Sequence, residues 1–176
     1  ISSEVDLNAD INLFEANTSF FTWVYFNSIG SWKFPHICWR YDSWTNRVWY
    51  LRANQNNESR LLNTYNTSNG WYYTINRRSI DTLSNNTRYH VWYTFDWATV
   101  KLYQDGVLLD STTSLTGSIK NNAEEIKLWF RWDWFSDGYL NWYLDWTAIW
   151  GRTLTPTNIT ALYNSGAWLP YSLFTS

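Results

Sequence analysis

The chain has few residues of the kinds that build covalent links and metal centres. Among its 176 residues are one cysteine, Cys38, and two histidines, His36 and His90. A single cysteine excludes a disulfide within the chain and a thiolate metal cluster, and two histidines are too few for a metal site built from histidine. We therefore expect packing to hold the fold, and His90 to be a strand residue with a satisfied hydrogen bond. The alternative, a nucleophilic Cys38 with a histidine base, finds no support in the neighbouring residues.

Strong charge and long apolar runs are also missing. With 13 basic and 15 acidic residues the formal charge is −2, and no basic run interleaves with the aromatics, so we expect no nucleic-acid partner. The apolar stretches are broken well before the roughly 20 residues needed to cross a bilayer, so no membrane insertion is expected. Ile1 is not an initiator, and no signal pattern accompanies it. We expect residues 1–176 to form a single domain cut from a longer protein.

Residues 88–111 carry two alternating strand patterns joined by a turn. The first pattern places an aromatic or aliphatic residue at every second position, namely Tyr89, Val91, Tyr93 and Phe95. Val100 and Leu102 repeat the alternation in the second run, and Asp105-Gly106 supplies the positive backbone angles of a two-residue type I′ turn. This pattern is typical of half-buried antiparallel strands.

Most of the remaining chain consists of short strand patterns separated by turn residues. Runs of this kind predict strands at Phe20 to Phe26, Trp49 to Ala53, Leu61 to Tyr65, Trp71 to Ile75, Tyr89 to Phe95, Thr99 to Gln104, Val107 to Ser111, Ile126 to Arg131 and Tyr143 to Trp150. No period of about 20 to 50 residues repeats, which excludes solenoids and propellers. The sequence therefore predicts an all-β fold, in which two antiparallel sheets pack face to face as a jelly roll.

One short helix is predicted near the C-terminus. Thr155 can cap its start, and the proline that follows fits the first helical position. Ile159 and Leu162 give an apolar face, and Gly166 suits a left-handed stop after the helix. We expect this to be the only substantial helix, packed by Ile159 and Leu162 across an end or edge of the sandwich.

Two long segments, in this order, resemble a known family. Residues 88–111 (RYHVWYTFDWATVKLYQDGVLLDS) are similar to a stretch of the form WYHV…TYDG…KLYVDG, and residues 138–166 (GYLNWYLDWTAIWGRTLTPTNITALYNSG) are similar to GYIDEVRIYNRALTPSEI followed by a short helix. Both stretches are typical of laminin-G-like domains in the concanavalin A-like lectin/glucanase superfamily. The resemblance runs from about Leu7 through most of the chain. It implies a concanavalin A-like jelly roll and an exported or cell-surface binding module.

Tryptophan is unusually frequent, with 15 residues beside only 7 glycines. Trp97, Trp129 and Trp142 stand where the resemblance calls for glycine. Glycine occupies such turns and close-packed strands because no side chain fits there or because the backbone angle is positive. Two explanations stay open: this branch of the family uses tryptophan at these positions, or the source organism reads the UGA codon as glycine.

Aromatic residues beside polar groups are typical of sugar sites, because the C–H face of a pyranose stacks on a ring while polar side chains bind its hydroxyls. The segments 39–42 (WRYD) and 131–134 (RWDW) have this chemistry, and Tyr50 and Arg52 share a strand face near the first. The predicted ligand-binding residues are Trp39, Arg40, Asp42, Tyr50, Arg52, Arg131, Trp132 and Asp133. The alternative is that these aromatics cap the end of the sandwich and the charged groups are solvated.

Calcium is the cofactor that the resemblance suggests, since many relatives bind it at the edge of a sheet. Carboxylate oxygens in turns suit Ca²⁺, and the predicted ligands are Asp10, Asp133 and Asp137. No calcium loop of fixed spacing is present, and aspartate in a turn is ordinarily a turn former. If Trp132 and Trp134 were glycines, the flexible acidic loop around Asp133 would suit calcium better than sugar.

Catalysis is not expected, although the superfamily contains endoglucanases. Retaining glycosidases need two carboxylates roughly 5 Å apart, which the related jelly-roll enzymes place on one strand face in an ExDxxE pattern. No such run occurs here, because Glu124 and Glu125 are adjacent and the strand containing Asp145 has no glutamate. We therefore predict a non-catalytic extracellular or cell-surface module that binds carbohydrate. The alternatives are a structural or protein-adhesion domain of a larger surface, fibre or virion protein and, far behind, an endoglucanase.

Overall fold

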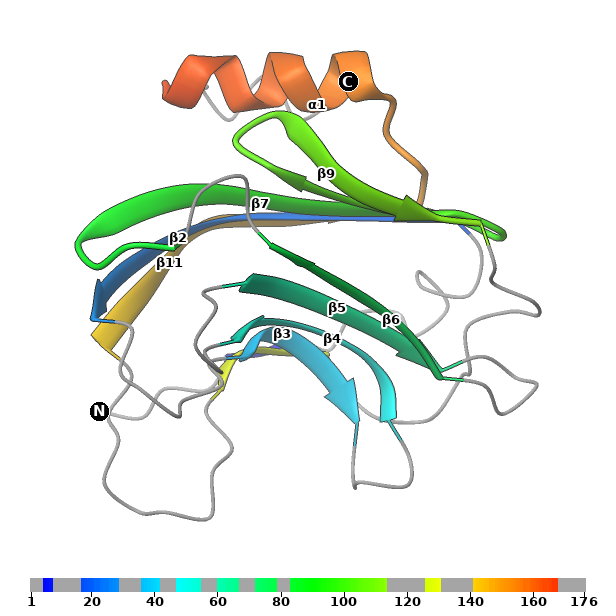
Figure 1. Cartoon of the computed structure of the whole chain (residues 1–176), viewed down its shortest axis with the longest axis horizontal. Helices are drawn as coiled ribbons and strands as arrows, with labels where there is room; N and C mark the ends of the chain where they lie inside the picture. Colours follow the sequence, from blue (N-terminus) through cyan, green and yellow to red (C-terminus); the bar gives the residue numbers. More distant parts are fainter. Residues whose placement is uncertain are drawn as a thin grey trace.

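The computed structural model describes residues 5–7, 17–28, 36–41, 47–54, 60–66, 72–78, 83–113, 126–130 and 141–167. These residues form two antiparallel sheets packed face to face, with one helix on the outer side of the smaller sheet (Figure 1). The predicted all-β sandwich with a short C-terminal helix is confirmed.

The smaller sheet contains five strands in the order β11-β2-β7-β8-β9. In that order they are β11 (Asn141–Trp150), β2 (Asn17–Ser28), β7 (Thr87–Asp96), β8 (Val100–Gln104) and β9 (Val107–Thr112). Neighbouring strands are antiparallel throughout. The two strand patterns of residues 88–111 form β7 and β8 in the interior of this sheet, but residues 97–99 join them. The predicted turn at Asp105-Gly106 instead joins β8 to β9, which lies at the edge.

The larger sheet contains six strands in the order β1-β10-β3-β4-β5-β6. In that order they are β1 (Val5–Leu7), β10 (Ile126–Phe130), β3 (His36–Tyr41), β4 (Arg47–Asn54), β5 (Arg60–Asn66) and β6 (Tyr72–Arg78). Strands from distant parts of the sequence are therefore neighbours, since β10 inserts between β1 and β3.

Strands β1 and β3 were not predicted from the sequence. Trp39 and Arg40 lie inside β3, so they belong to a strand and not to a loop at the end of the sandwich. The pairing of β3 with β4 shifts register near both ends, and the adjacent residues Ile37 and Cys38 are both fully buried. Bulges of this kind break the alternation on which strand prediction depends.

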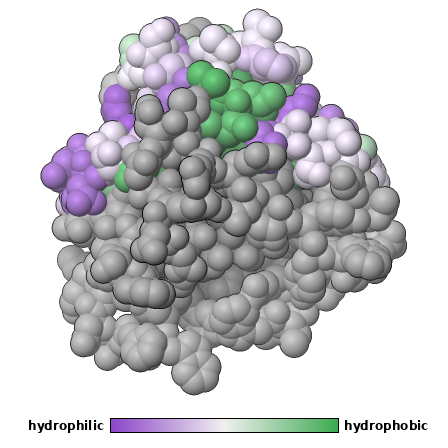
Figure 2. All heavy atoms as spheres, viewed as in Figure 1, coloured by the Kyte–Doolittle hydropathy of each residue, from purple (hydrophilic) through white to green (hydrophobic). Residues whose placement is uncertain are grey.

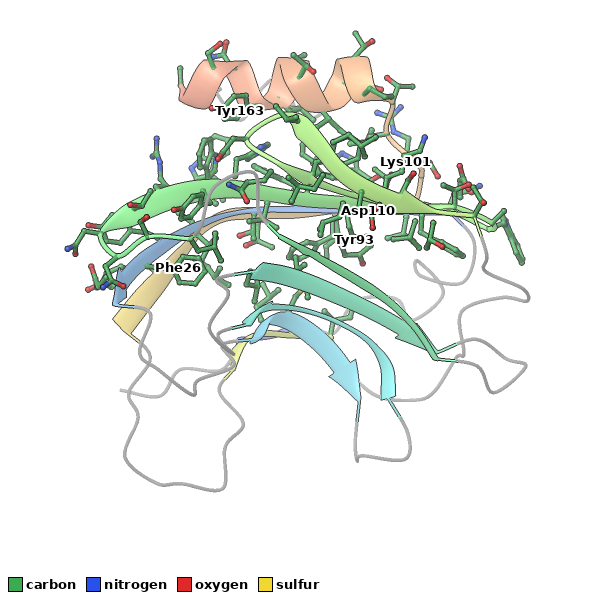
Figure 3. All side chains as sticks on the ribbon, viewed as in Figure 1. Phe26, Tyr93, Lys101, Asp110 and Tyr163 are labelled. Atoms are coloured by element: carbon green, nitrogen blue, oxygen red, sulfur yellow. The ribbon has the colours of Figure 1, made fainter. Side chains whose placement is uncertain are left out.

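The inter-sheet core is built from the inward faces of the strands. In Figure 3, Phe26 and Tyr93 lie on the side of the five-stranded sheet that faces the other sheet, and both are buried. Cys38 belongs to the same cluster, and burial raises the pKa of its thiol. The thiol therefore stays protonated at neutral pH, which favours a structural role over a nucleophilic one.

The hairpin turn has the geometry that the sequence predicts. Asp105 has φ +51° and Gly106 has φ +78°, as a type I′ turn requires. A carboxylate oxygen of Asp105 accepts the backbone N–H of His90 at 2.8 Å, and the Asp105 N–H donates to the His90 carbonyl at 2.8 Å. Gly106 also lies against α1, because a Cβ placed on it would be 2.8 Å from Cδ1 of Tyr163.

Helix α1 (Pro156–Tyr163) begins as predicted. The Thr155 hydroxyl accepts the Asn158 N–H at 3.2 Å, and the Asn158 side chain accepts the Thr155 N–H at 3.1 Å, which completes a reciprocal capping box. The left-handed stop is Asn164, with φ +45°, and Gly166 lies two residues beyond it. The predicted stop at Gly166 is therefore wrong, because asparagine also tolerates this conformation. No helix in the described ranges has the length and apolar character to span a bilayer.

The helix packs on the outer face of the five-stranded sheet rather than across an end or edge of the sandwich. Its Ile159 is fully buried against a cluster that includes Phe21, Trp23, Trp92 and Tyr103. In Figure 3, Tyr163 lies between the helix and this sheet. On this face β2 and β7 carry the large side chains of Phe21, Trp23 and Trp92, so the outward face needs cover as well as the inward face.

Replacing Gly106 with Ala should destabilise the fold more than replacing Gly166 with Ala. Both glycines have positive φ, but a Cβ at Gly106 would lie 2.8 Å from the Tyr163 ring, whereas a Cβ at Gly166 would lie at an ordinary 3.9 Å from the Tyr163 hydroxyl. We expect a loss of about 1 kcal/mol in the free energy of unfolding for Gly166→Ala, from backbone strain alone. Gly106→Ala adds overpacking and should cost about 2–4 kcal/mol. Urea unfolding measures both, and equal losses would contradict a close contact between the turn and the helix.

Candidate ligand-binding site

An aromatic layer covers the outer face of the five-stranded sheet. On β2 its members are Phe21, Trp23 and Tyr25, one at every second position. Helix α1 covers the first two, which are buried. Beyond the C-terminal end of the helix, Tyr25 is only half-buried and Tyr143 of β11 is 61 % exposed. The layer is therefore open to solvent at this end.

Tyr25 and Tyr143 form the open part of the layer. They are Cα partners across β2 and β11. Their ring centroids are 6.3 Å apart, and the ring planes are tilted by 34°. This separation lies within the range of favourable aromatic pairs, so the two rings form a shallow apolar surface at the end of the layer.

Arg88 borders this surface on the side of β7. It is the Cα partner of Tyr25, and its side chain is exposed. The guanidinium carbon lies 4.4 Å from the centroid of the Trp23 ring, and Nη2 donates to the Gly166 carbonyl at 3.0 Å. A cation–π contact and a hydrogen bond to the residues after α1 therefore hold the cation in place.

Asp145 borders the surface on the side of β11. It is exposed, and it is the Cα partner of Trp23. Because it stands two positions from Tyr143 on the same strand, it shares the face of Tyr143. The open end thus combines an aromatic surface, a cation and a carboxylate. A pyranose ring can stack on such a surface while its hydroxyls accept from guanidinium and donate to carboxylate.

Sequence reasoning selected none of these four residues for binding. The available signal was the outward stripe of Phe21, Trp23 and Tyr25 on one strand. The partner ring of Tyr143 could not be found in this way, because the register of β11 against β2 shifts twice, once on each side of Tyr143. The exposed end of the layer also depends on where α1 stops.

Four of the predicted binding residues lie in described strands: Trp39, Arg40, Tyr50 and Arg52. Trp39 of β3 and Tyr50 of β4 are Cα partners. The adjacent pair, Cys38 and Leu51, is buried in the core. By alternation, positions 39 and 50 belong to the opposite face of the six-stranded sheet. Figure 1 shows this sheet bowed, with its hollow side away from the five-stranded sheet.

The structure brings together three of these four strand positions. Arg52 stands two positions from Tyr50 and shares its face, whereas Arg40 alternates to the other face of β3. That the positions of Trp39, Tyr50 and Arg52 bind a ligand stays a prediction.

The other predicted site residues lie outside the described residues. These are Asp42, Arg131, Trp132 and Asp133 for the ligand and Asp10, Asp133 and Asp137 for calcium. Within the described ranges, no three His, Cys, Asp or Glu side chains lie together in a way that could hold a metal ion. Asp96 ends β7, and its carboxylate accepts the Thr99 N–H at 2.8 Å, which is a turn-forming role.

His90 lies buried inside the aromatic layer. Its ring centroid is 4.6 Å from those of Phe21 and Trp23, and 5.6 Å and 5.4 Å from those of Trp92 and Tyr163. Neither ring nitrogen has a hydrogen-bond partner in the described part of the chain, so the expected satisfied hydrogen bond is wrong. Burial lowers the pKa of His90 to about 3, which leaves a neutral packing residue rather than an acid or base.

The sequence profile of the laminin-G-type family described as "Concanavalin A-like lectin/glucanases superfamily" matches residues 2–160. The chain belongs to this superfamily. The match confirms the resemblance of the hairpin and of the closing segment. Among curated protein sequences, no match is found.

Solved structures similar to this concanavalin A-like domain include binding domains of botulinum neurotoxins. The receptor-binding domain of mosaic serotype C/D has a TM-score of 0.69 at 19 % identity, over 92 % of this chain and 39 % of that one. The serotype D binding domain has 0.66 at 21 % identity, over 93 % and 41 %, and the serotype G binding domain has 0.64 at 18 %, over 86 % and 36 %. The chain spans about two fifths of their length. At these identities the likeness shows the fold.

The buried histidine should make the stability of the domain depend on pH. Between the ordinary His pKa of 6.5 and the folded value of about 3, the unfolded chain binds a proton that the folded chain does not. The free energy of unfolding should therefore fall by about 1.4 kcal/mol for each pH unit as the pH drops through this window. Above pH 6.5, His90 contributes no pH dependence.

His90→Phe should remove this contribution while it keeps a ring in the layer. Urea unfolding of both proteins between pH 7 and pH 4.5 measures the two slopes, and their difference isolates His90 from His36. Equal slopes would mean that His90 is not buried in its neutral form.

Proposed function

We propose that the domain is a non-catalytic binding module of an exported or cell-surface protein and that its ligand is a carbohydrate. The observation that carries the proposal is the open end of the aromatic layer, where Tyr25 and Tyr143 lie between Arg88 and Asp145. A sugar ring on Tyr143 would bury apolar surface that α1 leaves exposed, and its hydroxyls would reach the charged groups at the border.

The comparisons support binding in general terms. The similar botulinum neurotoxin structures are described as receptor-binding or binding domains. The superfamily name includes lectins as well as glucanases. Trp39, Tyr50 and Arg52 on the hollow face of the six-stranded sheet are a second proposed location for the same function, and calcium at Asp10, Asp133 and Asp137 remains a prediction.

Adhesion to another protein is a second candidate function, because one sheet edge is apolar. Strand β9 ends the five-stranded sheet, and its Val107 and Leu108 are 52 % and 48 % exposed. Figure 2 shows a group of apolar residues below the helix, over β9. An edge strand with exposed apolar side chains suits contact with another chain.

Tyr143→Ala should weaken carbohydrate binding at least tenfold, or about 1.4 kcal/mol. A glycan array identifies a ligand for the unaltered domain, and titration calorimetry then compares the variants. Tyr143 is mostly exposed, so its removal should leave the fold intact. Leu108→Ala removes an exposed residue of the opposite edge and is the matched control.

The same titration separates the candidate sites. Loss of binding in Trp39→Ala with full binding in Tyr143→Ala would move the site to the hollow face of the six-stranded sheet. Full binding in both variants would contradict both locations. An array without any bound glycan, together with partner binding lost in Leu108→Ala, would favour protein adhesion.

The domain should not hydrolyse glucans. The prediction depends on the missing ExDxxE pattern and on a buried His90 unsuited to acid–base work. Incubation with laminarin-type polymers, followed by an assay of reducing ends, should show no release above background. Turnover that a single change such as Asp145→Asn or Glu124→Gln abolishes would establish an enzyme instead.

A further inference from the structure

Six residues other than glycine have positive φ in the described part of the chain. Four of them are small polar residues in turns or at the helix end: Asn86, Asp105, Asn164 and Ser165. The other two are Trp97, at φ +65°, and Trp146, at φ +46°. An L-residue in this conformation brings its Cβ close to the following carbonyl oxygen, and tryptophan has no short polar side chain to compensate. Two tryptophans in this conformation therefore call for an explanation.

Trp97 is the central residue of a tight turn between β7 and β8. The Ala98 N–H donates to the Asp96 carbonyl at 2.7 Å, so the hydrogen bond spans only Trp97. A three-residue turn with positive φ at its centre is rare and strained for a residue with a side chain. The indole is 52 % exposed, so burial does little to offset this strain. The position has the backbone requirements of glycine.

Trp146 lies in a bulge of β11. Asp145 pairs with Trp23 and Ala148 pairs with Phe21, so β11 has one more residue than β2 over this interval. Bulges of the type with a left-handed residue take glycine at that residue. In the family stretch GYIDEV, a glutamate follows the aspartate that corresponds to Asp145, so glycine at position 146 is indicated by the backbone alone.

We propose that positions 97 and 146 are glycine in the protein as its source organism makes it, because that organism reads the UGA codon as glycine and both codons are UGA. The structure thus extends the open explanation for Trp97 to Trp146. Trp129 and Trp142 lie in β10 and β11 and are not among the described residues with positive φ, so the proposal does not include them. Tyr25 and Tyr143 of the binding surface stay tyrosine under this proposal, because a different reading of UGA does not change tyrosine codons.

The gene sequence tests the proposal directly. Codons 97 and 146 should both be UGA. UGG at either position would show that tryptophan is encoded there and would overturn the proposal for that position.

Stability tests the physical argument without the gene. Trp97→Gly should raise the Tm of the 176-residue chain by roughly 2–4 °C, and Trp97→Ala should lie below Trp97→Gly by a similar amount, because alanine keeps the left-handed strain. The Tm of Trp146→Gly should likewise be higher than that of Trp146→Ala. Both variants lose the contacts of the indole, so the difference in Tm between them reports the backbone strain alone. Leu108 is the control, because it is an exposed strand residue without positive φ. The Tm of Leu108→Ala should be higher than that of Leu108→Gly. If the Ala variant at position 97 or 146 has a Tm equal to or above that of the Gly variant, the proposal is overturned for that position.

Discussion

The pairing of β2 with β7 is the constraint on which the rest of the structure depends. Residues 17–26 pair with residues 87–96 without a register shift. Both faces of these two strands are covered, because inward residues such as Phe20 and Tyr93 pack against the six-stranded sheet and outward residues such as Phe21 and Trp92 pack beneath α1. A slip of one residue would exchange the two sets. The register therefore fixes the inter-sheet core and the helix-covered layer together.

The same two strands determine where the helix lies and where it ends. The Ser19 hydroxyl donates to the Arg152 carbonyl at 2.9 Å and accepts the Leu154 N–H at 2.8 Å, which ties the segment before α1 to β2. After the helix, the Gly166 carbonyl accepts from Arg88 of β7. Since both ends are anchored, α1 covers a fixed part of the aromatic layer. Where the helix ends therefore determines that the Tyr25–Tyr143 pair is left uncovered.

Alternation in the sequence predicts every described strand except β3 and the three-residue β1, and residue chemistry predicts the Asp105-Gly106 turn and the Thr155 cap. It fails at β3, where a bulge puts two adjacent residues into the core. It also places α1 wrongly, because the apolar face of a helix does not reveal which surface it will cover. His90 shows a further limit: only the folded arrangement reveals that rings surround it where a hydrogen-bond partner was expected. The binding surface could not be predicted for two such reasons: it depends on the register of β11 against β2 and on where α1 ends.

Aromatic packing in this layer surrounds an imidazole whose nitrogens have no hydrogen-bond partner in the described part of the chain. A buried unsatisfied polar atom costs about 1–3 kcal/mol, whereas each aromatic pair contributes about 0.5–1.5 kcal/mol beyond its buried area. His90 has two such nitrogens and four surrounding rings, so the ring contacts are of the size needed to offset the cost of both. At the open end, Tyr143 contacts one ring among the described residues, that of Tyr25, and its side chain is mostly exposed. A ligand ring stacked there would continue the layer past the helix, and it would gain the burial that α1 gives to Phe21 and Trp23.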